Sequence, residues 1–249
     1  MSGHSKWASI KHKKAIVDSR RGAQFSKLTR AITVAARDGG PDPDANATLE
    51  NAVRKAKEAS MPKENIERAI AKGAGVGGEA DAIEAVLYEG YGPGGVAVLV
   101  EALTENRNRT SADVRHIFSK NGGNLGEPGS VAYLFDKKGT IVIDASKYSE
   151  DELMAAVEAG AEDISTDEGV FEVIAEPADF TSVRKALEEQ GVEMDSAEMA
   201  YRPSSVVPID ETQAGKLMRL IDALEDNDDV SAVHANFDVA ADVLERVAG

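Results

Sequence analysis

The residues with the clearest chemistry in this 249-residue sequence are the cations at its start. Residues 1–37 contain nine lysines and arginines against a single acid, Asp18, and the only tryptophan, Trp7, lies among them. Cationic side chains neutralise phosphates and release counterions, and an indole ring can stack on a base. The alternative is a solvated charged face with Trp7 packed as a plug in a core. On the first interpretation, the predicted nucleic-acid contacts are Lys6, Trp7, Lys11, Lys13, Lys14, Arg20, Arg21, Lys27 and Arg30.

The charge of the whole chain makes this cluster unusual. The formal net charge is −16 and the isoelectric point is about 4.7. Residues 1–72 hold 15 basic and 8 acidic side chains, a net of +7, whereas residues 73–249 hold 13 basic and 36 acidic side chains, a net of −23. An acidic body repels phosphate backbones. We therefore expect polyanions to be bound by the first segment of the chain.

A second cationic cluster lies inside the acidic part, in "ENRNRTSADVRH" at residues 105–116. Thr110 is suited to cap a helix there, and the free N–H groups of a helix N-terminus favour an anion. With Arg115 nearby, Arg107 and Arg109 are predicted to contact nucleic acid. An internal salt-bridge network with the many carboxylates is an equally good interpretation.

The sequence offers no catalytic or metal-binding pattern. The four histidines lack any metal-binding spacing, and neither a nucleophile-elbow nor a phosphate-loop motif is present. The absence of cysteine excludes disulfides and thiolate ligands. "EDNDD" at 225–229 lacks the glycine and the closing glutamate of a calcium loop, which favours a solvated helix end. We predict a protein that is not an enzyme and needs no cofactor or metal.

Hydropathy predicts no membrane partner. The sequence has no apolar run near 18 residues, and no apolar stretch follows the basic N-terminus as it would in a secretory signal. These features favour a cytoplasmic protein, and a monomer is the expected oligomeric state.

Periodicity predicts three helices in the first segment. Over residues 17–38, Phe25, Leu28, Ile32, Ala35 and Ala36 fall on one side of a helix, and most of the cations fall on the other. Two shorter helices follow, at about 48–60, where either Asn46 or Thr48 supplies the cap, and from Pro62 to Gly73. The glycine-rich "GAGVGG" is a flexible linker. We predict a basic helical domain over residues 1–78.

The remainder predicts two α/β units. "AVLYEGY" and "VAVLVEAL" are strands joined by a turn, followed by a helix and a third strand, "SVAYLF". A helix at 211–225 and the strand "VSAVHANF" complete this unit. Residues 138–204 carry the βαββαβ order of a ferredoxin-like domain. The prediction is an α+β multidomain chain: a three-helix domain, then two ferredoxin-like α/β domains, with 138–204 inserted between 79–137 and 205–249.

Four blocks of sequence resemble the YebC/PmpR family: "GHSKWASIKHKK", "PKENIERAIAKG", "EGYGPGGVAVLVEALTENRNRT" and "VRHIFSKNGGNLGEPGSV". The opening is more similar to the YebC branch. The family often has lysine where this chain has Ala23, and tryptophan where it has Tyr133. The resemblance implies a helical N-terminal domain followed by two α/β domains, and a cytoplasmic DNA-binding transcriptional regulator. It supplies no catalytic residues.

Three hypotheses about function follow. The first is a DNA-binding transcriptional regulator that uses the basic helical domain. The second is a ribosome-associated translation factor whose basic domain binds ribosomal RNA, because a mitochondrial relative activates translation and bacterial relatives have been linked to the ribosome. The third is an interaction scaffold whose acidic α/β domains bind basic proteins.

Overall fold

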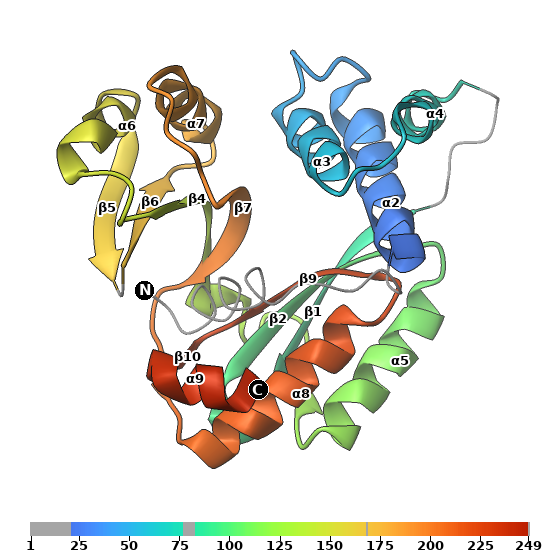
Figure 1. The fold of residues 1–249 in the computed structure, drawn as a ribbon. Helices are drawn as coiled ribbons and strands as arrows, with labels where there is room; N and C mark the ends of the chain where they lie inside the picture. Colours follow the sequence, from blue (N-terminus) through green and yellow to red (C-terminus); the bar gives the residue numbers. More distant parts are fainter. Residues whose placement is uncertain (1–20, 77–82, 168, 249) are drawn as a thin grey trace.

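The structure, a computed structural model, describes residues 21–76, 83–167 and 169–248. It confirms the predicted fold class: N-terminal helices are followed by antiparallel sheets in an α+β chain (Figure 1). In the described ranges, no helix has the length and apolar character needed to cross a membrane.

The helical domain consists of α2 (Arg21–Gly39), α3 (Ala47–Glu58) and α4 (Lys63–Gly73). The apolar stripe predicted for the first helix forms its core contact. Ile32, Ala35 and Ala36 are buried, with Phe25 and Leu28 packed against them at the edge. Burial of this stripe holds the three helices together, because single helices of this length are marginal in water.

Asn46, rather than Thr48, caps α3. Its side-chain oxygen accepts a hydrogen bond from the Leu49 N–H at 3.1 Å, and its amide nitrogen donates to the Ala35 carbonyl at 2.8 Å. One buried side chain therefore caps α3 and ties it to α2. The contact between α4 and α2 depends on a glycine, because a Cβ on Gly73 would lie 2.3 Å from the Thr33 carbonyl oxygen.

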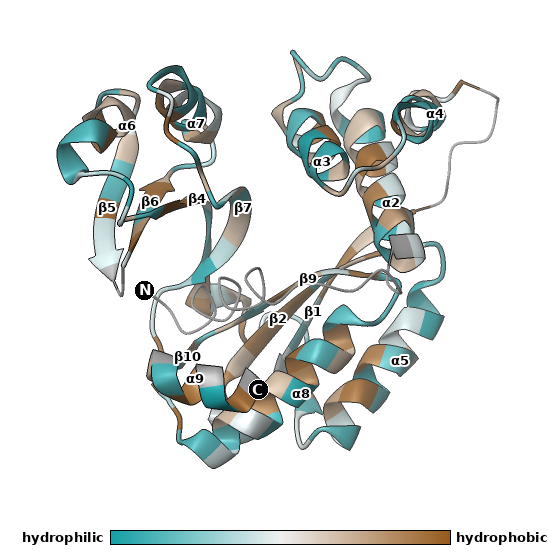
Figure 2. Ribbon diagram, in the orientation of Figure 1, coloured by the Kyte–Doolittle hydropathy of each residue, from teal (hydrophilic) through white to brown (hydrophobic). Residues whose placement is uncertain are grey.

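The middle domain is built on a four-stranded sheet in the order β3-β1-β2-β9, in which every pair is antiparallel. Its strands are β1 (Glu84–Tyr91), β2 (Ala97–Thr104), β3 (Asn124–Leu125) and β9 (Val230–Ala235). Three helices lie on one side of it (Figure 1): α5 (Arg107–Lys120), α8 (Glu211–Glu225) and α9 (Ala241–Ala248). Hydrophobic positions run along β1 and β2 and the adjoining parts of α5 and α8, and they form the largest core (Figure 2).

One predicted strand of this domain is wrong. "SVAYLF" forms a bend and a 3₁₀ helix, η3 (Ala132–Leu134), and the third strand is the short β3. The physical reason is Glu89, whose buried carboxylate accepts hydrogen bonds from the N–H groups of Gly129 at 2.6 Å, Val131 at 2.7 Å and Ala132 at 2.7 Å. These donors are therefore not available to a strand ladder. Helix α9 is a further element of this domain that was not predicted from the sequence.

The inserted domain has the predicted βαββαβ order. Its elements are β4 (Phe135–Asp144), η4 (Glu150–Leu153), α6 (Met154–Glu158), β5 (Ala161–Asp167), β6 (Val170–Ala175), α7 (Phe180–Glu189) and β7 (Ser196–Pro203). The antiparallel strand order β5-β6-β4-β7 is ferredoxin-like. Strand β4 crosses the boundary predicted at 137/138, because Phe135 to Lys138 pair with β7.

The middle domain differs from the inserted one in connectivity. Its β1–β2 hairpin occupies the centre of the sheet. Helix α8 and strand β9 follow the inserted domain in the chain, and β9 forms the edge of the sheet opposite to β3. A short parallel pair joins β8 (Val207–Pro208), which precedes α8, to β10 (Phe237–Asp238), which follows β9. The two halves of the middle domain therefore share one core, although about 70 residues separate them in the chain.

Candidate nucleic-acid interface

The predicted binding residues divide into those that the structure describes and those outside the described ranges. Arg21 is the first residue of α2, and Lys27, Arg30, Arg107 and Arg109 lie on described helices. Their assignment to nucleic-acid binding stays a prediction, as does that of the residues outside the described ranges: Lys6, Trp7, Lys11, Lys13, Lys14 and Arg20.

Two of these cations hold the helical domain on the middle domain. Lys27 donates its Nζ to the Glu225 carbonyl at 2.6 Å, and Arg30 donates Nη1 to the Asp228 carbonyl at 2.5 Å. Burial lowers the pKa of Lys27, and the nearby carboxylates of Glu225 and Asp228 offset only part of that effect. The "EDNDD" segment, expected to be a solvated helix end, is thus the docking surface of α2.

Asp229 is the central group of this contact. Its buried carboxylate accepts hydrogen bonds from Thr110 Oγ1 at 2.6 Å and Arg109 Nη2 at 2.8 Å, and it pairs with Arg30 Nη1 at 3.2 Å. Thr104 Oγ1 lies 3.3 Å away. Burial alone would raise the pKa of Asp229, but the hydrogen bonds from Thr110 and Arg109 and the two positive charges hold it below its ordinary value. We call Arg30, Arg109, Thr110 and Asp229 the Asp229 junction.

The predicted cap of α5 is wrong, and the correction explains the junction. Asn106 caps the helix, since its side chain accepts from the Arg109 N–H at 3.1 Å. Thr110 lies a turn further on and is buried, with its hydroxyl directed at Asp229. The anion expected near this helix end is therefore the protein's own carboxylate. For Arg109, the salt-bridge alternative describes the observed contact.

The junction brings the two separately predicted cationic clusters together. Arg30 comes from α2 and Arg109 from α5, and one carboxylate contacts both. The pairing of Asp229 with Thr110 could not be predicted from the sequence, because no spacing relates residues so far apart in the chain. The only sequence feature that pointed to a partner for these cations was the acidic composition of "EDNDD".

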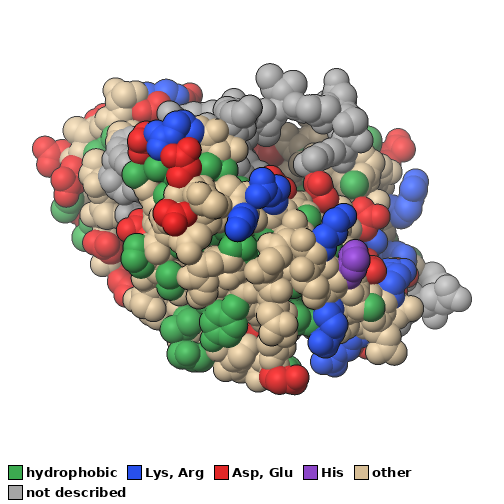
Figure 3. Space-filling model, turned by 90° about the horizontal axis from the view of Figure 1, so that it is seen from below, with side chains coloured by type: hydrophobic (Ala, Val, Ile, Leu, Met, Phe, Trp, Pro, Cys, Tyr) green, Lys and Arg blue, Asp and Glu red, His purple; other side chains and the backbone are tan. Residues whose placement is uncertain are grey.

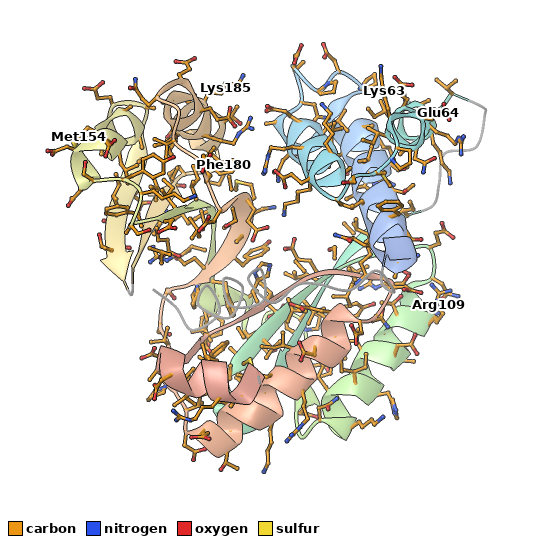
Figure 4. All side chains as sticks on the ribbon, in the orientation of Figure 1. Lys63, Glu64, Arg109, Met154, Phe180 and Lys185 are labelled. Atoms are coloured by element: carbon orange, nitrogen blue, oxygen red, sulfur yellow. The ribbon has the colours of Figure 1, made fainter. Side chains whose placement is uncertain are left out.

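Other cations of α5 remain exposed. Arg107, Arg115 and Lys120 lie on its outer surface with His116, and within the described parts of the chain the structure shows no ion pair for them. Figure 3 shows basic side chains gathered around a histidine over the helical side of the middle domain, and Figure 4 places Arg109 at the upper end of α5. Helix α5 therefore presents an exposed cationic face on this side of the middle domain.

The inserted domain is strongly acidic, in contrast to the cationic α5. Residues 138–204 contain 5 basic and 17 acidic side chains, a net of −12. It meets α3 through Lys55 and Glu198, 2.5 Å apart, and through a buried Arg184 that pairs with Glu50. Arg54 donates to the Ala197 carbonyl. Lys55 and Arg54 of the helical domain are thus used to hold the acidic domain, which contributes Arg184 to the same contact.

Nothing in the described residues suggests a metal centre. In residues 21–76, 83–167 and 169–248, no three histidine or carboxylate side chains are grouped so as to hold an ion. His234, for example, is buried and its Nε2 lies 2.8 Å from Glu101 Oε1, with the Tyr201 ring 5.4 Å away. This is an interdomain packing contact.

A helical N-terminal domain, an α/β domain and an inserted ferredoxin-like domain define a class of three-domain α+β proteins, and comparison with known proteins identifies the family. The TACO1/YebC protein N-terminal domain matches residues 5–76, and the TACO1/YebC second and third domain matches residues 83–237. The chain belongs to the TACO1/YebC family, which confirms the resemblance found in the sequence.

Relatives and a solved structure cover nearly the whole chain. A probable transcriptional regulatory protein of Rubrobacter xylanophilus is 56% identical over 250 residues, and the alignment covers 100% of both chains. A protein of the same name from Mycolicibacterium gilvum is 52% identical, with 99% of each chain covered. The crystal structure of a conserved hypothetical protein from Aquifex aeolicus matches with a TM-score of 0.82 at 52% identity, covering 93% of this chain and 96% of that one.

Proposed function

We propose that this chain is a nucleic-acid-binding regulator of gene expression, and that it acts on DNA as a transcriptional regulator through its basic N-terminal helical domain. Relatives that match over their full length are named probable transcriptional regulatory proteins. A regulatory role also agrees with the prediction that the chain is not an enzyme.

The observation that carries the proposal is the Asp229 junction. Arg30 of α2 and Arg109 of α5 lie 3.2 and 2.8 Å from one buried carboxylate. The N-terminal half of α2 is thereby held beside the beginning of α5. We infer that the cationic residues 1–20, which precede α2 in the sequence, act together with the exposed cations of α5 in binding.

The uneven distribution of charge between the domains determines which side of the protein can face a nucleic acid. A polyanion is attracted to Lys/Arg clusters and repelled by the inserted domain, whose net charge is −12. Phosphate contacts made by cations fix the position of a protein on its nucleic acid without reading the sequence. We infer that the helical domain and α5 provide affinity, while the acidic inserted domain faces away from the bound strand.

The proposal is tested by a salt titration with the full chain. If about six phosphates of a duplex are contacted, log K falls with log[salt] with a slope of roughly −5. A labelled 24-base-pair duplex of random sequence serves as the probe, and the triple variant Lys11→Glu, Lys13→Glu, Lys14→Glu should bind it far more weakly. Wild-type protein that shows no salt-dependent binding to this duplex would refute the proposal.

The same titration separates DNA from RNA. Single-stranded RNA and purified ribosomes are tested beside the duplex, again with the triple lysine variant. Binding to ribosomes or RNA that is lost in the variant, together with no binding to duplex DNA, would replace the transcriptional function with a translational one. Binding to neither class would leave the interaction scaffold.

A further inference from the structure

Helix α5 presents an exposed polar face that the Asp229 junction does not use. We propose that this face is a docking surface for duplex DNA, with α5 lying in the major groove. The inference rests on the proposed function and deepens it, because it names the element that meets the bases and the kind of nucleic acid that fits.

Core packing decides which side of α5 faces outward. Thr110, Val114 and Phe118 are buried at four-residue spacing, so they face the sheet and α8. The opposite side is lined by Asn108, Ser111, Ala112, Arg115, His116 and Ser119, which border a shallow depression of about 500 Å³. Small side chains at three of these positions let another surface approach the helix backbone closely.

The charge of this helix is opposite to that of the chain. α5 carries four basic residues and one acid, Asp113, within a protein of net charge −16. Most described arginines elsewhere are ion-paired, but for Arg107 and Arg115 the described residues supply no such partner. Arg219 on the neighbouring α8 is likewise exposed, with no ion pair in the described ranges. Unpaired cations on two adjacent helices form a surface complementary to phosphates.

The residue types on this face match the edges of base pairs in B-form DNA. Arginine binds guanine, asparagine binds adenine, and serine hydrogen-bonds to either, while flanking Arg and Lys side chains reach phosphates. The major groove of B-DNA is about 12 Å wide and admits a helix. The major groove of A-form RNA is deep and narrow and does not. The exposed face of α5 is therefore suited to duplex DNA rather than to duplex RNA.

The position of α5 keeps the acidic domain away from such a duplex. Helices α5 and α8 lie on one side of the middle sheet, and the inserted domain lies beyond the other (Figure 1). The upper side of β2 packs against Phe135 and Tyr201 of that domain. A duplex on α5 thus meets a helix with four basic residues and one acid, and the sheet lies between it and the −12 charge.

The test compares single charge reversals in the full chain. Arg115→Glu changes the proposed face, and Lys185→Glu makes the same kind of change at an exposed residue of α7 in the inserted domain (Figure 4). Binding of the labelled 24-base-pair DNA duplex and of a duplex RNA of equal length is measured between 50 and 200 mM KCl, values typical of such titrations. Thermal unfolding verifies that both variants fold.

We expect Arg115→Glu to weaken DNA binding about tenfold and to reduce the magnitude of the salt slope by about one, as loss of one phosphate contact does. Lys185→Glu should bind like wild type, and the RNA duplex should bind weakly and be insensitive to Arg115. Unchanged DNA affinity and slope in folded Arg115→Glu would overturn the inference. If the Lys11, Lys13 and Lys14 variant still lost binding in that case, the proposed function would stand without α5.

A second variant tests base contact separately from charge. A selection from random duplexes with wild-type protein gives a preferred sequence. We expect Asn108→Ala to lower affinity for that sequence toward its affinity for random DNA while leaving the salt slope unchanged, since asparagine contributes no phosphate charge. If Asn108→Ala retains the full preference, the bases are not read by this face.

Discussion

Replacing Asp229 by asparagine should weaken the contact between the helical domain and the middle domain while leaving the side-chain shape almost unchanged. The Asp229 side chain is 6% exposed, and its carboxylate accepts a hydrogen bond from Thr110 at 2.6 Å and pairs with Arg30 at 3.2 Å. An amide keeps the volume and one acceptor oxygen but removes the charge that compensates Arg30. We expect a loss of about 2 kcal/mol, because hydrogen bonds to charged groups contribute about 1.5–3 kcal/mol each and the amide retains part of this. More than half of the Arg109 side chain is exposed, so we attribute none of that loss to it.

The assay is thermal unfolding with Asp228→Asn as the matched control. Asp228 lies one residue away and contacts Arg30 only through its backbone carbonyl. Its exposed carboxylate acts on Lys27 only as a nearby charge that solvent screens. A loss of about 2 kcal/mol lowers the melting temperature by roughly 4–8 °C in a chain of this size. The control should stay within about 1 °C, as most surface substitutions do. Equal melting temperatures for the two variants would refute the role assigned to the junction.

The pH dependence of this difference has a defined sign. The pKa of Asp229 is lower in the folded protein than its ordinary value, so its contribution to stability is fully present above about pH 4 and is lost as the pH falls through the lower folded value. The free energy of unfolding should therefore be larger for the wild type than for Asp229→Asn from neutral pH down to about pH 5. The gap should narrow below pH 4, as measured by urea unfolding at each pH. A gap that widened in acid would contradict the assigned charge state.

Three further predictions concern the parts that support the site. Glu89→Gln should destabilise the chain by about 2–3 kcal/mol in urea unfolding, because an amide cannot accept from all three backbone donors that surround this position. Gly73→Ala should cost about 1–3 kcal/mol through its clash with α2, whereas Gly22→Ala, which has open space around it, should stabilise its helix by about 0.5–1 kcal/mol. Arg184→Ala should expose the contact between the helical and inserted domains to limited proteolysis, whereas Lys55→Ala, at a half-exposed ion pair, should not.

Local elements of this protein were largely predictable from the sequence. The helix expected at 211–225 is α8 within the same bounds, and the βαββαβ order of the inserted domain is as predicted. Both follow from periodicity, which depends only on neighbours within one or two turns. The strand assigned to "SVAYLF" is wrong because Glu89, about 40 residues earlier, takes the backbone donors of that stretch.

The position of the cations in space was decided by tertiary structure. Composition and periodicity determine that residues 1–72 are basic and that α2 has a cationic side. They do not determine that Lys27 and Arg30 are used against residues 225–229, while Arg107 and Arg115 stay exposed. The physical reason is that an ion pair depends on distance in space, and Arg30 meets the segment containing Asp228 across 198 positions of chain. Only the packing of the domains brings those charges together.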